Sequence, residues 1–174
     1  MSILVYIETN QNQIKKSSFE SLSYAKKLSK LISLDVIVVV INCSKLAPLN
    51  DFGPDKIISI NEKKLETFNA HNYADVISNV SKSVSAKNII ISDSINCKYL
   101  ASLLSVKLNA AFVSNVVSLP NSTNPFVVKR SAFSNKAFCE IEVNSEIKIL
   151  SISKNSIGLN ENKSEPIIIN TDIN

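Results

Sequence analysis

Glycine is nearly missing from this sequence of 174 residues, in which Gly53 and Gly158 are the only two. Loops that cradle phosphate groups need glycine because only a residue without a side chain lets the backbone approach the ligand closely. Two isolated glycines therefore exclude both the dinucleotide-binding G-x-G-x-x-G fingerprint and the P-loop.

Arginine, aromatic residues and clustered positive charge are also scarce. Arg130 is the only arginine beside 18 lysines, tryptophan does not occur, and aromatic residues make up 6% of the chain. The net charge is +4, and the lysines are scattered singly or in pairs such as Lys15-Lys16. Nucleic-acid-binding surfaces normally combine clustered arginine and lysine with stacking aromatic rings. We therefore expect no nucleic-acid partner.

Cysteine and histidine are too few and too widely spaced for the common metal and catalytic sites. Cys43, Cys97 and Cys139 form no pair with the spacing of a zinc knuckle or a redox dithiol, and distant, odd-numbered thiols fit a reducing cytosol. His71 is the only histidine, and no G-x-S-x-G motif presents a nucleophile to it. We expect a structural role for His71, no metal site and no catalytic residues.

Long hydrophobic runs do not occur either. Two of the longest, residues 3–7 and 36–41, are far shorter than the roughly 20 residues that a helix needs to span a bilayer. No basic segment precedes the first run, so the N-terminus does not resemble an export signal. These features predict a cytoplasmic protein without a membrane span.

The sequence does have the composition of one α/β domain and its alternation of strand and helix patterns. Hydrophobic residues make up 45% and charged residues 20%, as in globular proteins. Up to Pro120, short apolar runs alternate with amphipathic helical patterns, the first of which opens with the capping-box pair Ser17 and Glu20. Strands of a mainly parallel sheet are predicted at residues 3–7, 36–41, 56–60, 88–92 and 112–119, and helices at 17–32, 73–84 and 98–108.

The pattern changes after Pro120 to strands joined by short turns. A small antiparallel β-meander at the C-terminal end of the domain is predicted by residues 126–130, 137–143 and 147–152. We expect the domain to cover residues 1–157 and a polar tail or linker to follow at 158–174. Within the tail, Ile167 to Ile169 form either a terminal strand or a docked segment.

Three polar residues stand where open α/β sheets bind ligands. Glu8 follows the first predicted strand, and Asp93 and Ser94 follow the fourth. Ligands of such sheets bind outside the carboxyl ends of the strands, and helix N-termini there favour anions. Glu8, Asp93 and Ser94 are therefore candidates for cofactor binding, although we favour turning the chain and capping helices as their role.

Arg130 is distinctive because its planar guanidinium carries five donors and pairs with carboxylates or phosphates in a bidentate way that lysine does not. Two interpretations stay open for it. One is a role at a site or interface, and the other is an internal salt bridge at a strand end.

Eight short segments occur in a fixed order along the chain: residues 3–8, Lys15-Lys16, Ser23-Tyr24-Ala25, Tyr73-Ala74-Asp75, residues 98–101, Leu108-Asn109-Ala110, Val128-Lys129-Arg130 and Asn135-Lys136-Ala137. In order and spacing they resemble the N-terminal domain of the electron transfer flavoprotein alpha subunit, over about residues 1–157. The resemblance implies an open, mainly parallel sheet flanked by helices, of the nucleotide-hydrolase-like and Rossmann-like kind. This agrees with the pattern of strands and helices.

The resemblance also implies an electron carrier rather than an enzyme. Members of the family are heterodimers of alpha and beta subunits that carry electrons on FAD from flavin dehydrogenases, such as the acyl-CoA dehydrogenases of fatty acid β-oxidation, to the respiratory chain. In the family, a second, C-terminal domain of the alpha subunit binds most of the FAD, and AMP, where present, lies in the beta subunit. We expect that second domain to be absent from this chain, so that a flavin-binding domain in trans or downstream would supply it.

Two segments depart from the family pattern. Cys97 to Leu103 stand where many members have Gly-Arg/Lys-Asp-Leu-x-Pro-Arg, so no ligand-binding role is carried over to them. Phe133 to Ala137 stand where members often show Tyr-Ala-Gly-Asn-Ala. Arg130 is the residue best carried over, and we expect it, with Phe133, near the junction with the flavin domain or the partner subunit.

Two functions stay open on this basis. The first is a non-catalytic module of an electron transfer flavoprotein that packs on a beta-like subunit and supports a flavin domain. The second is a stand-alone adenine-nucleotide-binding domain of similar fold that uses the strand edges near Glu8 and Asp93. Nucleotide titration discriminates between them, because only the second predicts saturable binding of AMP or ATP. A hydrolytic enzyme is disfavoured, since no set of nucleophile, base and oxyanion donors can be assembled.

Overall fold

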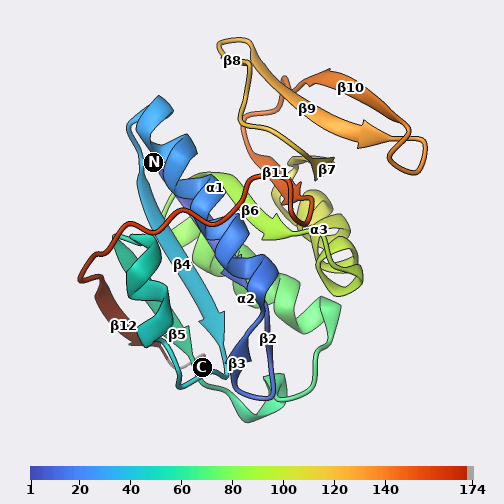
Figure 1. The fold of residues 1–174 in the computed structure, drawn as a ribbon. Helices are drawn as coiled ribbons and strands as arrows, with labels where there is room; N and C mark the ends of the chain where they lie inside the picture. The colour runs from blue at the N-terminus through green and yellow to red at the C-terminus, as the bar shows by residue number, and fades with distance from the viewer. Residues whose placement is uncertain (172–174) are drawn as a thin grey trace.

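Two sheets and three main helices make up the computed structural model, which describes residues 1–171 (Figure 1). The helices are α1 (Lys16–Ile32), α2 (Ala70–Ser83) and α3 (Ile95–Leu108), and two short 3-10 helices are η1 (Ala47–Phe52) and η2 (Lys63–Leu65). The strands are β1 (Ser2–Ile7), β2 (Thr9–Asn10), β3 (Gln13–Ile14), β4 (Asp35–Ile41), β5 (Lys56–Ile60), β6 (Ala86–Ser92), β7 (Ala111–Val116), β8 (Ser122–Thr123), β9 (Phe126–Ala132), β10 (Ala137–Glu142), β11 (Lys148–Ile152) and β12 (Ile167–Thr171).

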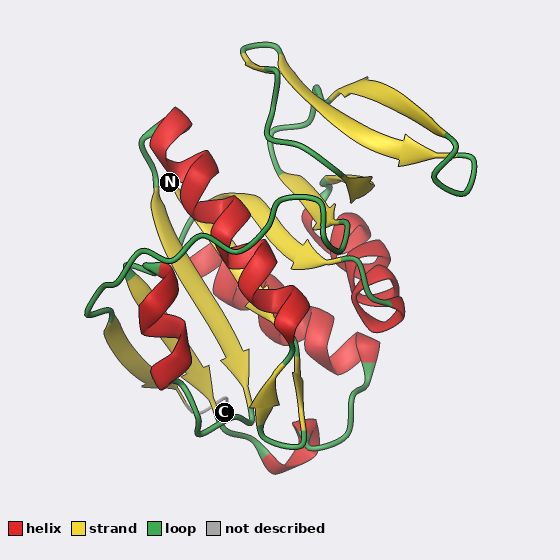
Figure 2. Cartoon of the chain, viewed as in Figure 1, coloured by secondary structure: helices red, strands yellow, loops and turns green. Residues whose placement is uncertain are grey.

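Ten of the strands form one mixed, mainly parallel sheet, and β2 and β3 form a separate antiparallel pair (Figure 2). The strand order of the large sheet is β10-β9-β7-β11-β6-β1-β4-β5-β12, with β8 paired to β9. An α/β fold with an open, mainly parallel sheet flanked by helices was predicted from the sequence, and this prediction is confirmed. No helix of the described residues is long and apolar enough to cross a membrane.

The central strands are buried on both faces, which explains their uninterrupted apolar sequences. Alternate side chains of β1 and β4 point into two different cores. Ile3, Val5 and Ile7 pack with α1, whereas Leu4 and Tyr6 pack with α2 and α3 on the opposite face. Each fully buried side chain of this kind stabilises the fold by roughly 1.5–3 kcal/mol.

The start of α1 differs from the sequence-based prediction. The expected capping box is wrong: the helix begins at Lys16, Lys15 occupies the N-cap position, and no side chain caps it. The Glu20 carboxylate turns instead to a distant segment and accepts hydrogen bonds from the backbone N–H groups of Asn155 (2.9 Å) and Gly158 (3.3 Å). A capping box is a local signal, and here a long-range turn takes the carboxylate away from it.

The position of β11 also differs from the prediction. Residues 147–152 were expected as the third strand of an antiparallel meander, but β11 lies between β6 and β7 and pairs with both in parallel. Its side chains Ile149 and Leu150 are fully buried. The sequence signals strands and short turns but not pairing partners, and burial in the middle of the parallel sheet outweighs pairing with the neighbouring hairpin.

The antiparallel part is therefore formed by β8, β9 and β10, in which β9 pairs with both of the others, and its hairpin of β9 and β10 extends away from the rest of the molecule (Figure 2). It is joined to the main sheet through a short ladder, in which Val116 of β7 lies opposite Arg130 of β9. The hairpin ends in a turn where Phe133, Ser134 and Asn135 all have positive φ.

The segment after β11 runs back across the α1 side of the molecule to the far edge of the sheet (Figure 1). It is attached by backbone hydrogen bonds from Asn162 to Asp51 (2.7 Å) and from Ser164 to Asn50 (2.8 Å). Ile167 to Ile169 lie in β12, which pairs in parallel with β5, so of the two alternatives left open for this segment the structure shows the terminal strand. Of the tail predicted at 158–174, residues 172–174 lie outside the described residues.

Candidate functional site

The sheet has a topological switch point between β1 and β6. From β1 the chain moves to β4 and β5 on one side, and through α2 it then returns to β6 on the other side. Open α/β sheets bind ligands in the crevice outside the carboxyl ends of the two strands at such a point. Glu8 follows β1 and Asp93 follows β6, so the structure brings these sequence-predicted candidates to the same edge.

Glu8 is turned into the protein at this edge, with 3% of its surface exposed. One carboxylate oxygen, Oε1, accepts a hydrogen bond from the Lys15 ammonium at 2.7 Å, and Oε2 accepts one from the Ser92 hydroxyl at 3.2 Å. The Glu8 backbone N–H donates to the Ser18 hydroxyl at 2.9 Å. The negative charge of Glu8 is therefore balanced inside the fold by Lys15, and a role of Glu8 in cofactor binding stays a prediction.

Cys97 lies beneath this ion pair, with its sulfur 3.4 Å from the Ser92 hydroxyl. Burial raises the pKa of the Cys97 thiol to about 11, and the nearby Glu8 carboxylate acts in the same direction. The reactive form of cysteine is the thiolate, which this environment disfavours. Cys97 is thus a buried structural thiol rather than a nucleophile.

Asp93 and Ser94 make similar internal contacts. The Asp93 carboxylate accepts a hydrogen bond from the Ser151 hydroxyl at 2.6 Å and pairs with the Lys98 ammonium at 2.9 Å. Ser94 is the N-cap of α3, and its hydroxyl accepts a hydrogen bond from the backbone N–H of Cys97 at 3.1 Å. These contacts are those of the turning and capping roles, and a role in cofactor binding stays a prediction.

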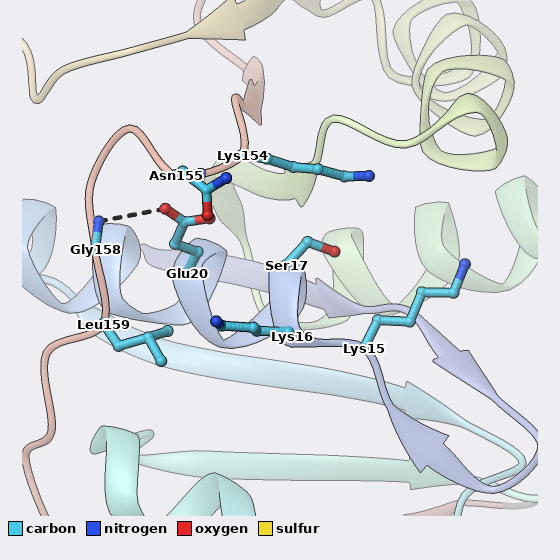
Figure 3. A pocket seen from close by; sticks show the side chains of 8 residues that line it. All are labelled: Lys15, Lys16, Ser17, Glu20, Lys154, Asn155, Gly158 and Leu159. Carbon is cyan, nitrogen blue, oxygen red and sulfur yellow. Dashed lines mark hydrogen bonds between the residues drawn. The ribbon is translucent and has the colours of Figure 1, made fainter.

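A cavity of about 520 Å³ lies beside the switch point, on the α1 side (Figure 3). Figure 3 shows lysine side chains from two distant segments around it, Lys15 and Lys16 at the start of α1 and Lys154 after β11. The remaining lining residues are Ser17, Glu20, Asn155, Gly158 and Leu159. Sequence reasoning missed Lys154, because only the unexpected position of β11 brings it to this edge.

The residues of this cavity do not fit FAD. Flavin and adenine rings bind in pockets lined mainly by apolar and aromatic side chains, and none of the eight lining residues is aromatic. Gly158 has open space next to its Cα, but a side chain at Gly53 would collide with Asn162 at 2.7 Å. Only one of the two glycines thus leaves room for a ligand to approach the backbone.

A second hollow of about 320 Å³ lies at the carboxyl edge of β1 and β4, on the side of α2 and α3. Phe68 and Tyr73 contribute to its wall, with ring centroids 4.9 Å apart. The rest of the wall is mainly polar and includes Lys15, which borders both cavities. Of the two cavities, this hollow is the one with aromatic residues in its wall.

His71 and the interface candidates lie elsewhere. His71 is exposed in the first turn of α2, where its backbone N–H donates to the Asn69 cap at 3.0 Å. Arg130 is half-buried in β9 and donates from a terminal guanidinium nitrogen to the Ser114 hydroxyl at 3.2 Å. Phe133 stands at the tip of the hairpin with 79% of its surface exposed. Arg130 thus points into the fold, whereas Phe133 points out of it.

Acidic, histidine and cysteine side chains do not gather into a metal site anywhere in residues 1–171, in which no group of three or more could hold an ion. All three cysteines are free thiols, Cys43 and Cys97 buried and Cys139 partly exposed.

Comparison with known proteins gives a consistent family. The model of the electron transfer flavoprotein domain matches residues 3–169. The electron transfer flavoprotein subunit alpha of Bacillus subtilis is 21% identical over 160 residues, which cover 91% of this chain and 49% of that protein. The subunit alpha of Syntrophomonas wolfei is 23% identical over 143 residues, which cover 82% of this chain and 44% of that protein. The chain therefore spans about half the length of these relatives.

Proposed function

The chain belongs to the electron transfer flavoprotein domain family, and from this premise we propose that it is a non-catalytic module of an alpha-type electron transfer flavoprotein. In this role it packs against a beta subunit and supports electron transfer from flavin dehydrogenases, such as acyl-CoA dehydrogenases, to the respiratory chain. The observation that carries the proposal is the family match over residues 3–169, together with relatives named as alpha subunits.

The FAD of this system is held, in our proposal, by a flavin-binding domain in trans or downstream of residues 1–157. The cationic, non-aromatic lining of the cavity beside α1 supports this assignment, because it offers nothing on which a flavin ring could stack. Free thiols at Cys43, Cys97 and Cys139 fit a reducing compartment, so we place the module in the cytoplasm.

The hairpin of β9 and β10 is the surface that we assign to the beta subunit. Phe133 and Phe138 expose 79% and 61% of their surfaces there, and the Lys129 ammonium lies 4.6 Å from the centre of the Phe138 ring. Aromatic residues dominate the energetics of protein interfaces. Arg130 does not contact the partner in this assignment. Its hydrogen bond to Ser114 holds the hairpin against β7.

Co-purification tests this assignment. We expect the chain to form a complex with a co-expressed electron transfer flavoprotein beta subunit, and Phe133→Asp to weaken the complex by at least about tenfold, because a buried aromatic anchor contributes 2 kcal/mol or more as a rough guide. The matched control is Leu31→Asp, which changes another exposed apolar residue, 53% exposed, at the end of α1.

Two results would contradict the proposal. One is a wild-type chain that does not associate with the beta subunit. The other is a purified chain that shows stoichiometric flavin absorbance in its visible spectrum, since the proposed module holds no flavin by itself. Equal binding of Phe133→Asp and the wild type would refute only the assignment of the hairpin.

Adenine-nucleotide binding is the second candidate function, and the two cavities at the switch point favour it. The side chain of Lys15 borders both cavities. A bound nucleotide could therefore place its phosphate group near Lys15, Lys16 and Lys154 and its base near Phe68 and Tyr73, with Lys15 next to both parts. Calorimetric titration with AMP and ATP tests this candidate. Saturable heat that Lys154→Ala reduces would support it, and the scaffold proposal predicts no saturable heat.

A further inference from the structure

The outer face of α3 carries an apolar stripe. Ile95, Tyr99 and Val106 expose 74%, 65% and 82% of their surfaces, while the opposite face of the helix is buried through Leu100, Leu104 and others. A surface helix of a globular protein normally pairs a buried apolar face with a polar outer face. The apolar outer face of α3 departs from this rule, and contiguous exposed apolar surface marks interaction sites.

The stripe has the spacing of a helix-pairing seam. Ile95, Tyr99, Ser102 and Val106 follow one another at intervals of four, three and four residues, the a/d spacing of coiled coils. Ser102, the small member, is exposed, and its hydroxyl already donates to the Lys98 carbonyl at 3.0 Å. Covering the stripe would therefore leave no unpaired hydroxyl at Ser102.

When two copies of α3 pack antiparallel, the large residues of the stripe in one copy lie opposite smaller residues in the other. If two copies of α3 cross about the midpoint between Leu100 and Ala101, Ile95 of one copy faces Val106 of the other. In the same register the large Tyr99 faces the small Ser102. A parallel pair would instead place Tyr99 against Tyr99, with no small residue opposite.

Charge does not oppose this pairing. The two lysines that flank the stripe each pair within their own chain, Lys98 with Asp93 at 2.9 Å and Lys107 with Asp75 at 2.6 Å. Two copies of the face would therefore meet without bringing unbalanced lysines together, and antiparallel helices also place the positive end of one helix dipole beside the negative end of the other.

We propose that the stripe of Ile95, Tyr99, Ser102 and Val106 is a homodimer contact, in which α3 of a second copy of this chain packs antiparallel across a two-fold axis. The seam is about 16 Å long, from the helical rise. Standard interfaces bury about 800 Å² on each partner, and one helix pair of this length buries less. The dimer is accordingly weak and forms in a concentration-dependent manner. This contact is separate from the hairpin assigned to the beta subunit.

Site-directed disulfide formation tests the register in the full chain. In a Cys139→Ser background, one variant carries Ile95→Cys and the other Val106→Cys, which leaves only buried native thiols at Cys43 and Cys97. Mixing the two variants under mild oxidation is expected to give at least a fivefold excess of the mixed 95–106 dimer over either homodimer. The reason is that positions 95 and 95 of two copies lie about 16 Å apart along the seam, beyond the reach of a disulfide.

The control mixture pairs Val106→Cys with Leu31→Cys, which places the thiol on another exposed apolar position, in α1. Equal yields in the two mixtures, or a predominance of 95–95 and 106–106 products, would overturn the proposal. Sedimentation of the native chain supplies a second measurement: the average mass is expected to rise above 19.1 kDa with concentration, and Tyr99→Lys to abolish the rise. A native chain that stays monomeric at millimolar concentration would also overturn it.

Discussion

At the scale of single residues, the switch point is filled by an internal charge pair. Glu8 is buried, and the half-exposed Lys15 supplies the opposite charge at 2.7 Å. Buried pairs of this type contribute modestly as a unit, but removing one partner leaves a desolvated charge without compensation. The edge of the sheet where related folds place a ligand is thus stabilised by the protein's own side chains.

The Lys15→Met variant tests this balance. It keeps the aliphatic stem but leaves the buried Glu8 carboxylate without its partner, so we expect a loss of about 1–3 kcal/mol in the free energy of unfolding, measured with urea, because solvent at the half-exposed Lys15 already screens part of the pair. The control is Lys16→Met, since the Lys16 side chain is exposed one residue away and should change stability by less than about 0.5 kcal/mol. Equal effects of the two substitutions would show that Glu8 does not depend on Lys15.

The Cys97 thiol makes the free energy of unfolding fall as the pH rises above 9. Its pKa is raised from 9.0 to about 11 in the folded state, so the unfolded chain releases this proton first as the pH rises. The thiol therefore contributes stability fully below pH 9, and the contribution is lost as the pH rises from 9 to 11, by up to about 3 kcal/mol.

Urea unfolding of the wild type and Cys97→Ala between pH 8 and pH 11 measures this contribution. The wild type should lose stability more steeply than the variant, because titrations of lysine and tyrosine are common to both. Parallel pH profiles would mean that the thiol titrates alike in the folded and unfolded chains.

The sequence predicted residue roles where the signal is local and missed them where it is not. Ser94 caps the helix directly after it, as its position indicates. Glu20 matched a local capping pattern, yet its carboxylate binds a turn at Asn155 to Gly158. No local pattern around Glu20 predicts that turn, because the turn reaches α1 only through the path of the chain after β11.

At the scale of elements, the apolar runs and helical periodicities located most strands and all three main helices, because the central strands are buried on both faces and carry unbroken apolar sequences. The pairing of β11 could not be read in this way. A strand with the same local pattern can extend a hairpin or enter a parallel sheet, and only the packing of the whole core decides between the two.

Truncation of a side chain in β11 tests its central position. Leu150→Ala should lower the free energy of unfolding by 2–5 kcal/mol as a rough range, because Leu150 is fully buried between β6 and β7. Ile168→Ala in the edge strand β12 is the comparison, since Ile168 is 50% exposed and should cost about 1 kcal/mol or less. Similar losses at both positions would contradict a central β11.

At the scale of the whole molecule, the structure combines a body with a buried core on each face of the sheet and several exposed apolar surfaces. Buried apolar side chains form the two cores, one on each face of the sheet. The hairpin around Phe133 and the stripe on α3 are two of these surfaces, and Ile167 to Ile169 of the edge strand β12 are exposed as well. A large core combined with exposed aromatic residues at a projecting hairpin suits a module that holds partners in place, which is the role that we propose from the family match.

Native mass spectrometry of the chain co-expressed with an electron transfer flavoprotein beta subunit tests the central proposal most directly. We expect a peak for a one-to-one complex, and a flavin-free peak for any unassociated chain. A spectrum in which the chain stays apart from the beta subunit and carries FAD by itself would contradict it.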